Sequence, residues 1–141
     1  MILRGVRNCN PANIRRGSKW KGMRTEQHDK DFVQFITMDY GIRALIIVLR
    51  TYVTVHGLHS IRSIITRWAP PSDHNHTEKY INYVQQVLKA NCPIVEKGLH
   101  LSDFCPASSD YLYWLCYAMC WMESGYVLER ADFDRVMRVM I

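Results

Sequence analysis

The feature that most constrains the fold is an uncharged run, YLYWLCYAMCWM, at residues 111–122. It is too short to cross a bilayer, which takes roughly 18 or more apolar residues. Because the run is apolar on nearly every side, it predicts a central helix that other helices surround. A single carboxylate, Glu123, follows the run, and Gly125 is the residue at which we expect the helix to end.

Helical spacing of apolar residues recurs elsewhere and predicts further helices at residues 37–57, 60–68, 75–88 and from Asp132 onward. Prolines in APPSDHN end the second of these, because proline cannot continue a helix. Asn75 with Glu78 three residues later forms a capping-box pattern, which predicts where the third begins. Ser108 or Ser109 is the expected cap of the central helix.

The N-terminal third is rich in Asn, Gly and Arg and has no helical period. NCNPAN predicts a tight turn, because asparagine side chains bond to their own backbone. Short extended pieces are expected at NIRR and DFVQFI. We therefore predict a mainly α (α+β) fold in one domain, residues 1–141, with a β/loop subregion at 1–36 and a helical part at 37–141.

The net charge of +5 is unevenly placed, because residues 1–24 hold seven Arg and Lys and no acid. Such a basic segment predicts a polyanionic partner: nucleic acid, an anionic cell-wall polymer or an acidic membrane surface. A solvated arm without a partner is the equal alternative. Nucleic acid is the least favoured, because the segment contains no recognisable reading helix.

The five cysteines form no CxxC pair, and free buried thiols are expected for Cys116 and Cys120. The histidines and cysteines do not fall at zinc spacing, and the chain has no nucleotide-binding glycine loop, so we expect no metal and no cofactor. The start of the chain lacks the pattern of a secretion signal.

Glu123 is the candidate for acid chemistry. A carboxylate at the end of a buried helix loses hydration, which raises its proton affinity and suits it to act as a general acid. In glycoside cleavage such an acid protonates the leaving oxygen. The alternative is that Glu123 is an ordinary residue at a helix end.

ESGY after an apolar helix resembles the acid motif of the lysozyme-like superfamily, especially soluble lytic transglycosylases and goose-type lysozymes. FVQF resembles the G-L-M-Q strand that faces the acid there, which places Gln34. HTEKYINYV resembles a later helix whose tyrosine points at the acid, which places Tyr80. The motifs occur here in a different order, and a circular permutation reconciles the two orders. This resemblance implies a permuted lysozyme-like domain with Glu123 as its catalytic acid.

A second resemblance spans almost the whole chain. RGVRNCNPANIRRG, WKGM, RWAPPSDHNHTEKY and the late MESG are similar to a family of phage and prophage virion proteins. Its members begin R-G-I-R-N-N-N-P-x-N-I-R; this chain differs at Cys9, where asparagine is usual, and has Asp73 where glutamate is common. The resemblance implies a virion-associated or prophage-encoded protein that opens peptidoglycan.

Other side chains are candidates for holding a glycan. The amides of Asn8, Asn10 and Asn13 suit sugar hydroxyl and acetamido groups, although they equally suit a structural turn. Trp20 and Tyr40 either stack on sugar rings or pack in the core. Tyr80 either holds the carboxyl by a hydrogen bond or packs in the core.

We expect cleavage of peptidoglycan glycan strands by a muramidase or lytic transglycosylase that uses Glu123 alone as general acid, with Gln34 and Tyr80 in the catalytic site. The alternative is a non-catalytic virion structural or wall-binding protein on a lysozyme-like scaffold. Other virion proteins are further candidate partners. The expected location is the virion, or the bacterial cytoplasm followed by delivery to the wall.

Overall fold

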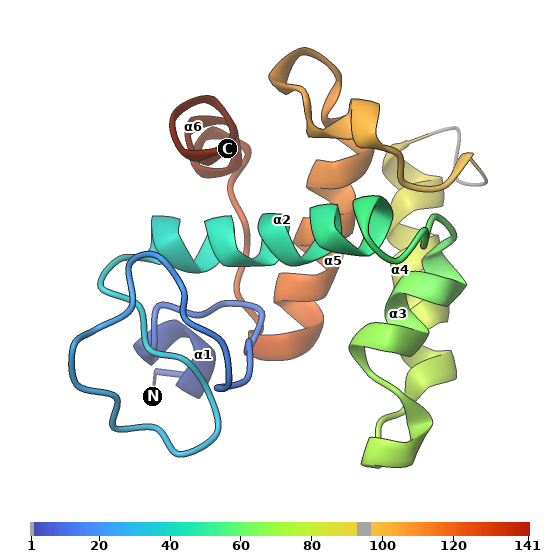
Figure 1. Ribbon diagram of the computed structural model, residues 1–141. Helices are drawn as coiled ribbons and strands as arrows, with labels where there is room; N and C mark the ends of the chain where they lie inside the picture. The colour runs from blue at the N-terminus through green and yellow to red at the C-terminus, as the bar shows by residue number, and fades with distance from the viewer. Residues whose placement is uncertain (1, 93–96) are drawn as a thin grey trace. The chain divides into compact units, whose positions relative to one another are not determined.

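The computed structural model describes residues 2–92 and 97–141, and this part of the chain is mainly helical, as predicted (Figure 1). Its α-helices are α1 (Arg4–Arg7), α2 (Met38–Thr54), α3 (Ile61–Trp68), α4 (Thr77–Asn91), α5 (Asp110–Ser124) and α6 (Arg130–Met140). Short 3-10 helices lie at Pro71–Asp73 (η1), Leu101–Phe104 (η3) and Pro106–Ser108 (η4). The lysozyme-like and permuted character of the fold stays a prediction.

The N-terminal third contains two isolated antiparallel bridges, Arg15 with Phe32 and Met23 with Phe35. The first joins the two segments that the sequence predicts to be extended, and the second joins the later of these segments to Met23. The backbone N–H of Val33 donates to the Ile14 carbonyl at 3.0 Å, which continues the first bridge. The described residues of this region form no strand longer than a single bridge. Hydrogen bonds between loops therefore give the region its shape.

The chain separates into two compact units. The first comprises residues 1–47 and 119–141, and the second comprises residues 48–118. Both α2 and α5 therefore contribute one part to each unit. The prediction of one domain from end to end stays a prediction, but the boundary expected near residue 36 does not coincide with this division.

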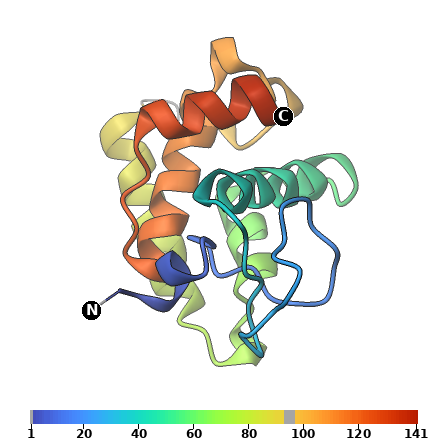
Figure 2. The same cartoon turned by 90° about the vertical axis from the view of Figure 1, so that its left-hand side faces the viewer.

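The first unit joins the N-terminal loops and the start of α2 to the end of α5 and to α6. Its core includes Val33, Phe35, Ile42, Leu45 and Phe133, all fully buried. Two contacts fix α6 against α2: the Arg135 guanidinium pairs with Asp39 at 2.8 Å, and Arg43 Nε donates to the Met140 carbonyl at 3.3 Å. Figures 1 and 2 both show α1 beside the last turn of α5.

In the second unit, α3 and α4 lie side by side (Figure 1). Ser60 caps α3, because its hydroxyl accepts a hydrogen bond from the Ser63 N–H at 3.1 Å. Across the pair, the Arg62 guanidinium makes two hydrogen bonds, of 2.6 and 3.2 Å, to the Glu78 carboxylate. The apolar faces of the two helices, which include Ile64, Ile65, Ile81 and Leu88, are fully buried.

Three helix starts differ from the sequence prediction. Helix α4 begins after His76, whose side chain makes no capping bond, whereas Asn75 donates to the Pro70 carbonyl at 3.0 Å. Helix α6 begins at Arg130, two residues before the expected Asp132. Helix α1 was not predicted, because four residues are too few to show a helical period.

Within the described part of the chain, the helices all fall short of the length and apolar character needed to span a membrane.

Candidate functional site

Glu123 lies in the last turn of α5, on the side of the helix that faces the core. It is three residues after Cys120 and four after Met119, so all three share one helical face. Cys120 and Met119 are fully buried, whereas Glu123 is partly exposed. The neighbouring Trp121 and Met122 are exposed at 47% and 38%. Glu123 thus lies at the end of the buried helix face, where that face reaches the protein surface.

The helix ends directly after the acid. Gly125 has φ +65°, a left-handed conformation that glycine adopts without strain, and its N–H donates to the Trp121 carbonyl at 2.9 Å. This is the C′ glycine expected from the sequence. It fixes Glu123 within the last turn instead of in a free loop.

The asparagine turn, residues 8–13, is bonded to this end of α5. Asn13 Nδ2 donates to the Glu123 carbonyl oxygen at 2.9 Å, and Ser124 Oγ donates to the Pro11 carbonyl at 2.7 Å. Gly5 allows the close approach, because a Cβ placed there would lie 2.7 Å from the Ser124 Cβ. The structure therefore places Asn13, a predicted substrate residue, next to the backbone of the predicted acid.

The other predicted amides have partners inside the N-terminal loops. Asn10 Nδ2 donates to the Ile14 and Val33 carbonyls, and its Oδ1 accepts from the Ile14 N–H at 2.9 Å. Gln34 Nε2 donates to Asn8 Oδ1 at 3.0 Å, and its Oε1 accepts from the His28 N–H at 2.7 Å. Asn8, Asn10 and Gln34 are all buried. Their amides hold the loops together, which is the structural role that was weighed for the asparagines.

An ion pair that the sequence did not reveal joins the exposed Arg4 to the buried Asp29 in these loops. Arg4 donates two hydrogen bonds to Asp29, of 2.6 and 2.5 Å, and Asn8 Nδ2 donates a third at 3.0 Å. Hydrogen bonding from Arg4 holds the pKa of the Asp29 carboxyl far below its usual range, against the opposing effect of burial. No spacing signal connects Arg4 to Asp29, because the two are 25 residues apart.

The predicted stacking residues Trp20 and Tyr40 lie at the loop that contains Gly22. The Tyr40 ring packs directly on Gly22, because a Cβ there would be 2.1 Å from Tyr40 Cγ. Trp20 is partly buried and its Nε1 atom is enclosed without a partner among the described residues. Each ring is therefore partly enclosed by the protein, Tyr40 against Gly22 and Trp20 at its Nε1 atom.

Tyr80 belongs to α4 in the second unit, where it is 6% exposed on the same helix face as Ile81 and Val84. This is the core position that was weighed as its alternative role. Its predicted action on the acid stays a prediction.

The charge of Glu123 also affects its neighbours on α5. Burial raises the pKa of the Cys120 thiol, and the negative charge of Glu123 raises it further. The Cys120 thiol, three residues before the acid, is therefore a buried neutral group.

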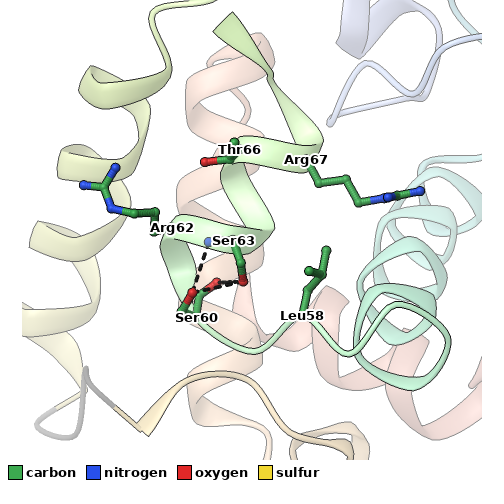
Figure 3. A pocket seen from close by; sticks show the side chains of 6 residues that line it. All are labelled: Leu58, Ser60, Arg62, Ser63, Thr66 and Arg67. Atoms are coloured by element: carbon green, nitrogen blue, oxygen red, sulfur yellow. Dashed lines mark hydrogen bonds between the residues drawn. The ribbon is translucent and has the colours of Figure 1, made fainter.

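The second unit contains a separate open pocket of about 680 Å³ on α3, lined by Leu58, Ser60, Arg62, Ser63, Thr66 and Arg67 (Figure 3). Three of its polar side chains have partners: Ser60 bonds to Ser63 within the pocket, and Arg62 bonds to Glu78 of α4. The Arg67 guanidinium lies over the Tyr52 ring, 5.5 Å from its centroid. Among residues 2–92 and 97–141, no cluster of side chains suited to a metal ion occurs.

Comparison with known proteins connects the chain to a phage. It is similar to protein P5 of Pseudoalteromonas phage PM2, with 48% identity over 85 residues. The match covers 57% of this chain and 52% of that protein, so the chain spans about half the length of its relative. No family model matches the chain. The similarity supports the phage association predicted from the sequence motifs.

Proposed function

We propose that the protein cleaves the glycan strands of peptidoglycan in the service of a phage, with Glu123 as its single general acid. The observation that carries the proposal is the position of this carboxylate. It is partly exposed at the end of a helix face whose preceding residues, Met119 and Cys120, are fully buried. The resemblance of ESGY to the acid motif of lytic transglycosylases and the similarity to a phage protein support it.

The residues around Glu123 suit this role. A general acid must reach the glycosidic oxygen with its proton, and Glu123 is exposed enough to meet a substrate. Asn13 and Ser124 fix the last turn of α5 through the Glu123 and Pro11 carbonyls. Asn13 is thus a positioning residue for the acid in this proposal. A lytic transglycosylase needs no second carboxylate, because the 6-hydroxyl of the substrate closes on the anomeric carbon.

The test is loss of turbidity of purified peptidoglycan. We expect Glu123→Gln to lower the rate by about 10² to 10⁴, the usual contribution of a general acid. Glu129→Gln is the matched control, because Glu129 is an exposed carboxylate whose side chain makes no capping bond at α6. Both variants should unfold at the same denaturant concentration as the parent. Equal clearing by the parent and Glu123→Gln refutes the assignment.

A second candidate function is a non-catalytic virion or wall-binding protein on the same scaffold. The observation that favours it is that Asn8, Asn10 and Gln34 use their amides on internal partners. It predicts binding to peptidoglycan sacculi without release of soluble muropeptides. Mass spectrometry of the supernatant separates the two functions, and a 1,6-anhydro end in the products identifies a transglycosylase.

A further inference from the structure

Cations without acids are concentrated in one loop of the first unit. Residues 15–22, RRGSKWKG, are here called the basic loop; they carry four cations and no acid. The three acids of residues 23–31 have other partners: Asp29 and Asp31 both pair with Arg4, and Glu26 lies 3.4 Å from His28. Residues Arg15, Arg16, Lys19 and Lys21 are all exposed. Within the described part of the chain none of them has a carboxylate partner.

The basic loop is held at both ends and in the middle. At its start the Arg16 N–H donates to the Asp31 carbonyl at 2.9 Å, and at its end the Ile36 N–H donates to the Gly22 carbonyl at 2.8 Å. Gly22 has φ +81° and supports the Tyr40 ring, and the partly buried Trp20 anchors the centre. A loop fixed in this way loses little entropy when its cations bind a partner.

The aromatic rings near these cations are each partly occupied by groups of the protein itself. Phe32 lies under two guanidinium groups, with Arg4 at 4.5 Å and Arg15 at 5.2 Å from the ring centroid. Tyr40 packs on Gly22, and the Trp20 Nε1 atom is enclosed. Proteins that bind single-stranded nucleic acid rely on exposed rings as well as cations. Residues 15–22 also contain no helix to enter a groove of duplex DNA.

We propose that the basic loop is a docking site for a linear, base-free polyanion whose charges are phosphates, as in phosphate-rich polymers of bacterial surfaces. This docking proposal rests on the proposed function for its biological setting. It deepens that function, because it names the kind of polymer that holds the protein at the cell wall. Docking through the loop does not involve the Glu123 carboxylate, so the two proposals are tested separately.

The experiment measures binding of long-chain inorganic polyphosphate as a function of salt concentration. We expect the affinity of the parent to fall steeply with salt, because binding releases counterions from the polymer. The variant Arg15→Gln/Lys19→Gln/Lys21→Gln should lose roughly 2 units of the slope of log affinity against log salt, since each phosphate contact contributes about 0.7 for a flexible strand. Its affinity at low salt should fall by at least about tenfold.

The matched control is Lys79→Gln/Lys89→Gln/Arg138→Gln, which removes the same charge from exposed helix positions. It should keep the slope of the parent. The proposal is overturned if the control weakens as much as the loop variant, if the loop variant binds like the parent, or if DNA of equal phosphate number stays bound to higher salt than polyphosphate. Glu123→Gln should bind polyphosphate normally, so loss of clearing with retained binding separates failure of catalysis from failure of docking.

Discussion

Gly41 lies in the first turn of α2, where the helix backbone meets the asparagine turn. A Cβ at this position would lie 2.0 Å from the Cys9 carbonyl oxygen and 2.9 Å from Pro11 Cδ. Both obstacles are backbone or ring atoms, which cannot rotate away as the end of a flexible side chain can. The start of α2 therefore approaches the turn only because this residue has no side chain.

Gly41→Ala separates helix propensity from packing. Propensity alone predicts stabilisation by about 1 kcal/mol, because alanine favours helices more than glycine does. Overpacking of this severity typically costs about 1–3 kcal/mol or more, so we expect net destabilisation of roughly 2 kcal/mol. Urea unfolding of the parent and the variant measures the difference. A variant as stable as the parent would show that the turn moves away from the helix at little cost.

The amide-rich turn itself was predictable at residue scale, but its partners were not. NCNPAN predicted that asparagines would shape a turn, and Asn10 does so through the Ile14 N–H. Asn8 finds its amide partner 26 residues away in Gln34, and Asn13 finds the Glu123 carbonyl 110 residues away. Composition indicates the ability to form such bonds, whereas tertiary folding decides which groups meet.

At the scale of elements, the Asp29 group ties α1 to the loop at residues 24–31. Arg4 supplies two hydrogen bonds to Asp29, and the N–H groups of Asp31 and Phe32 donate to the same carboxylate at 2.9 and 3.0 Å. Because α1 has only four residues and no side-chain cap, its position depends on this attachment. The carboxylate must be ionised for all of these donors to be satisfied.

This attachment predicts a specific loss of stability in acid. Since folding lowers the pKa of Asp29, its stabilising contribution is complete above the unfolded pKa of about 4 and is lost as pH falls further. Asp29→Asn should therefore be less stable than the parent at pH 7, and the difference should shrink as the pH falls from about 5 toward 2. Guanidinium unfolding at several pH values measures it. A difference that is constant across this range contradicts the role of the charge.

Helix interiors were easier to predict than helix starts. The apolar periods of α2 to α6 mark buried faces, and Ser60 and Gly125 occupy their predicted end positions. The predicted capping box failed because both of its side chains have other partners: Glu78 pairs with Arg62, and Asn75 bonds to the Pro70 carbonyl. A three-residue spacing cannot reveal such competition from another helix.

At the scale of the whole molecule, the chain leaves the first unit within α2 and returns to it within α5. The helical period of α2 continues past residue 47, and α5 is apolar on both sides of residue 118, so nothing in the sequence marks the division. The first unit is closed by side-chain bonds between its early and late segments, among them the pair that joins the asparagine turn to Glu123 and Ser124. The single-domain prediction requires the two units to unfold together, in one cooperative transition.

Hydrogen exchange of the variant Asn13→Gly/Ser124→Ala answers it. Glycine tolerates the left-handed φ of +53° at position 13, so the variant removes two hydrogen bonds without adding backbone strain. Each bond contributes about 1 kcal/mol, so amide protection in residues 2–47 and 119–141 should fall by roughly 10- to 30-fold while residues 48–118 outside the undescribed segment change little. Ser60→Ala, which removes the cap of α3, should have the reciprocal effect in the second unit. An equal loss of protection throughout the chain for both variants would instead establish one cooperative domain. In such a domain each substitution lowers the free energy of global unfolding, so every amide that exchanges through global unfolding loses the same protection.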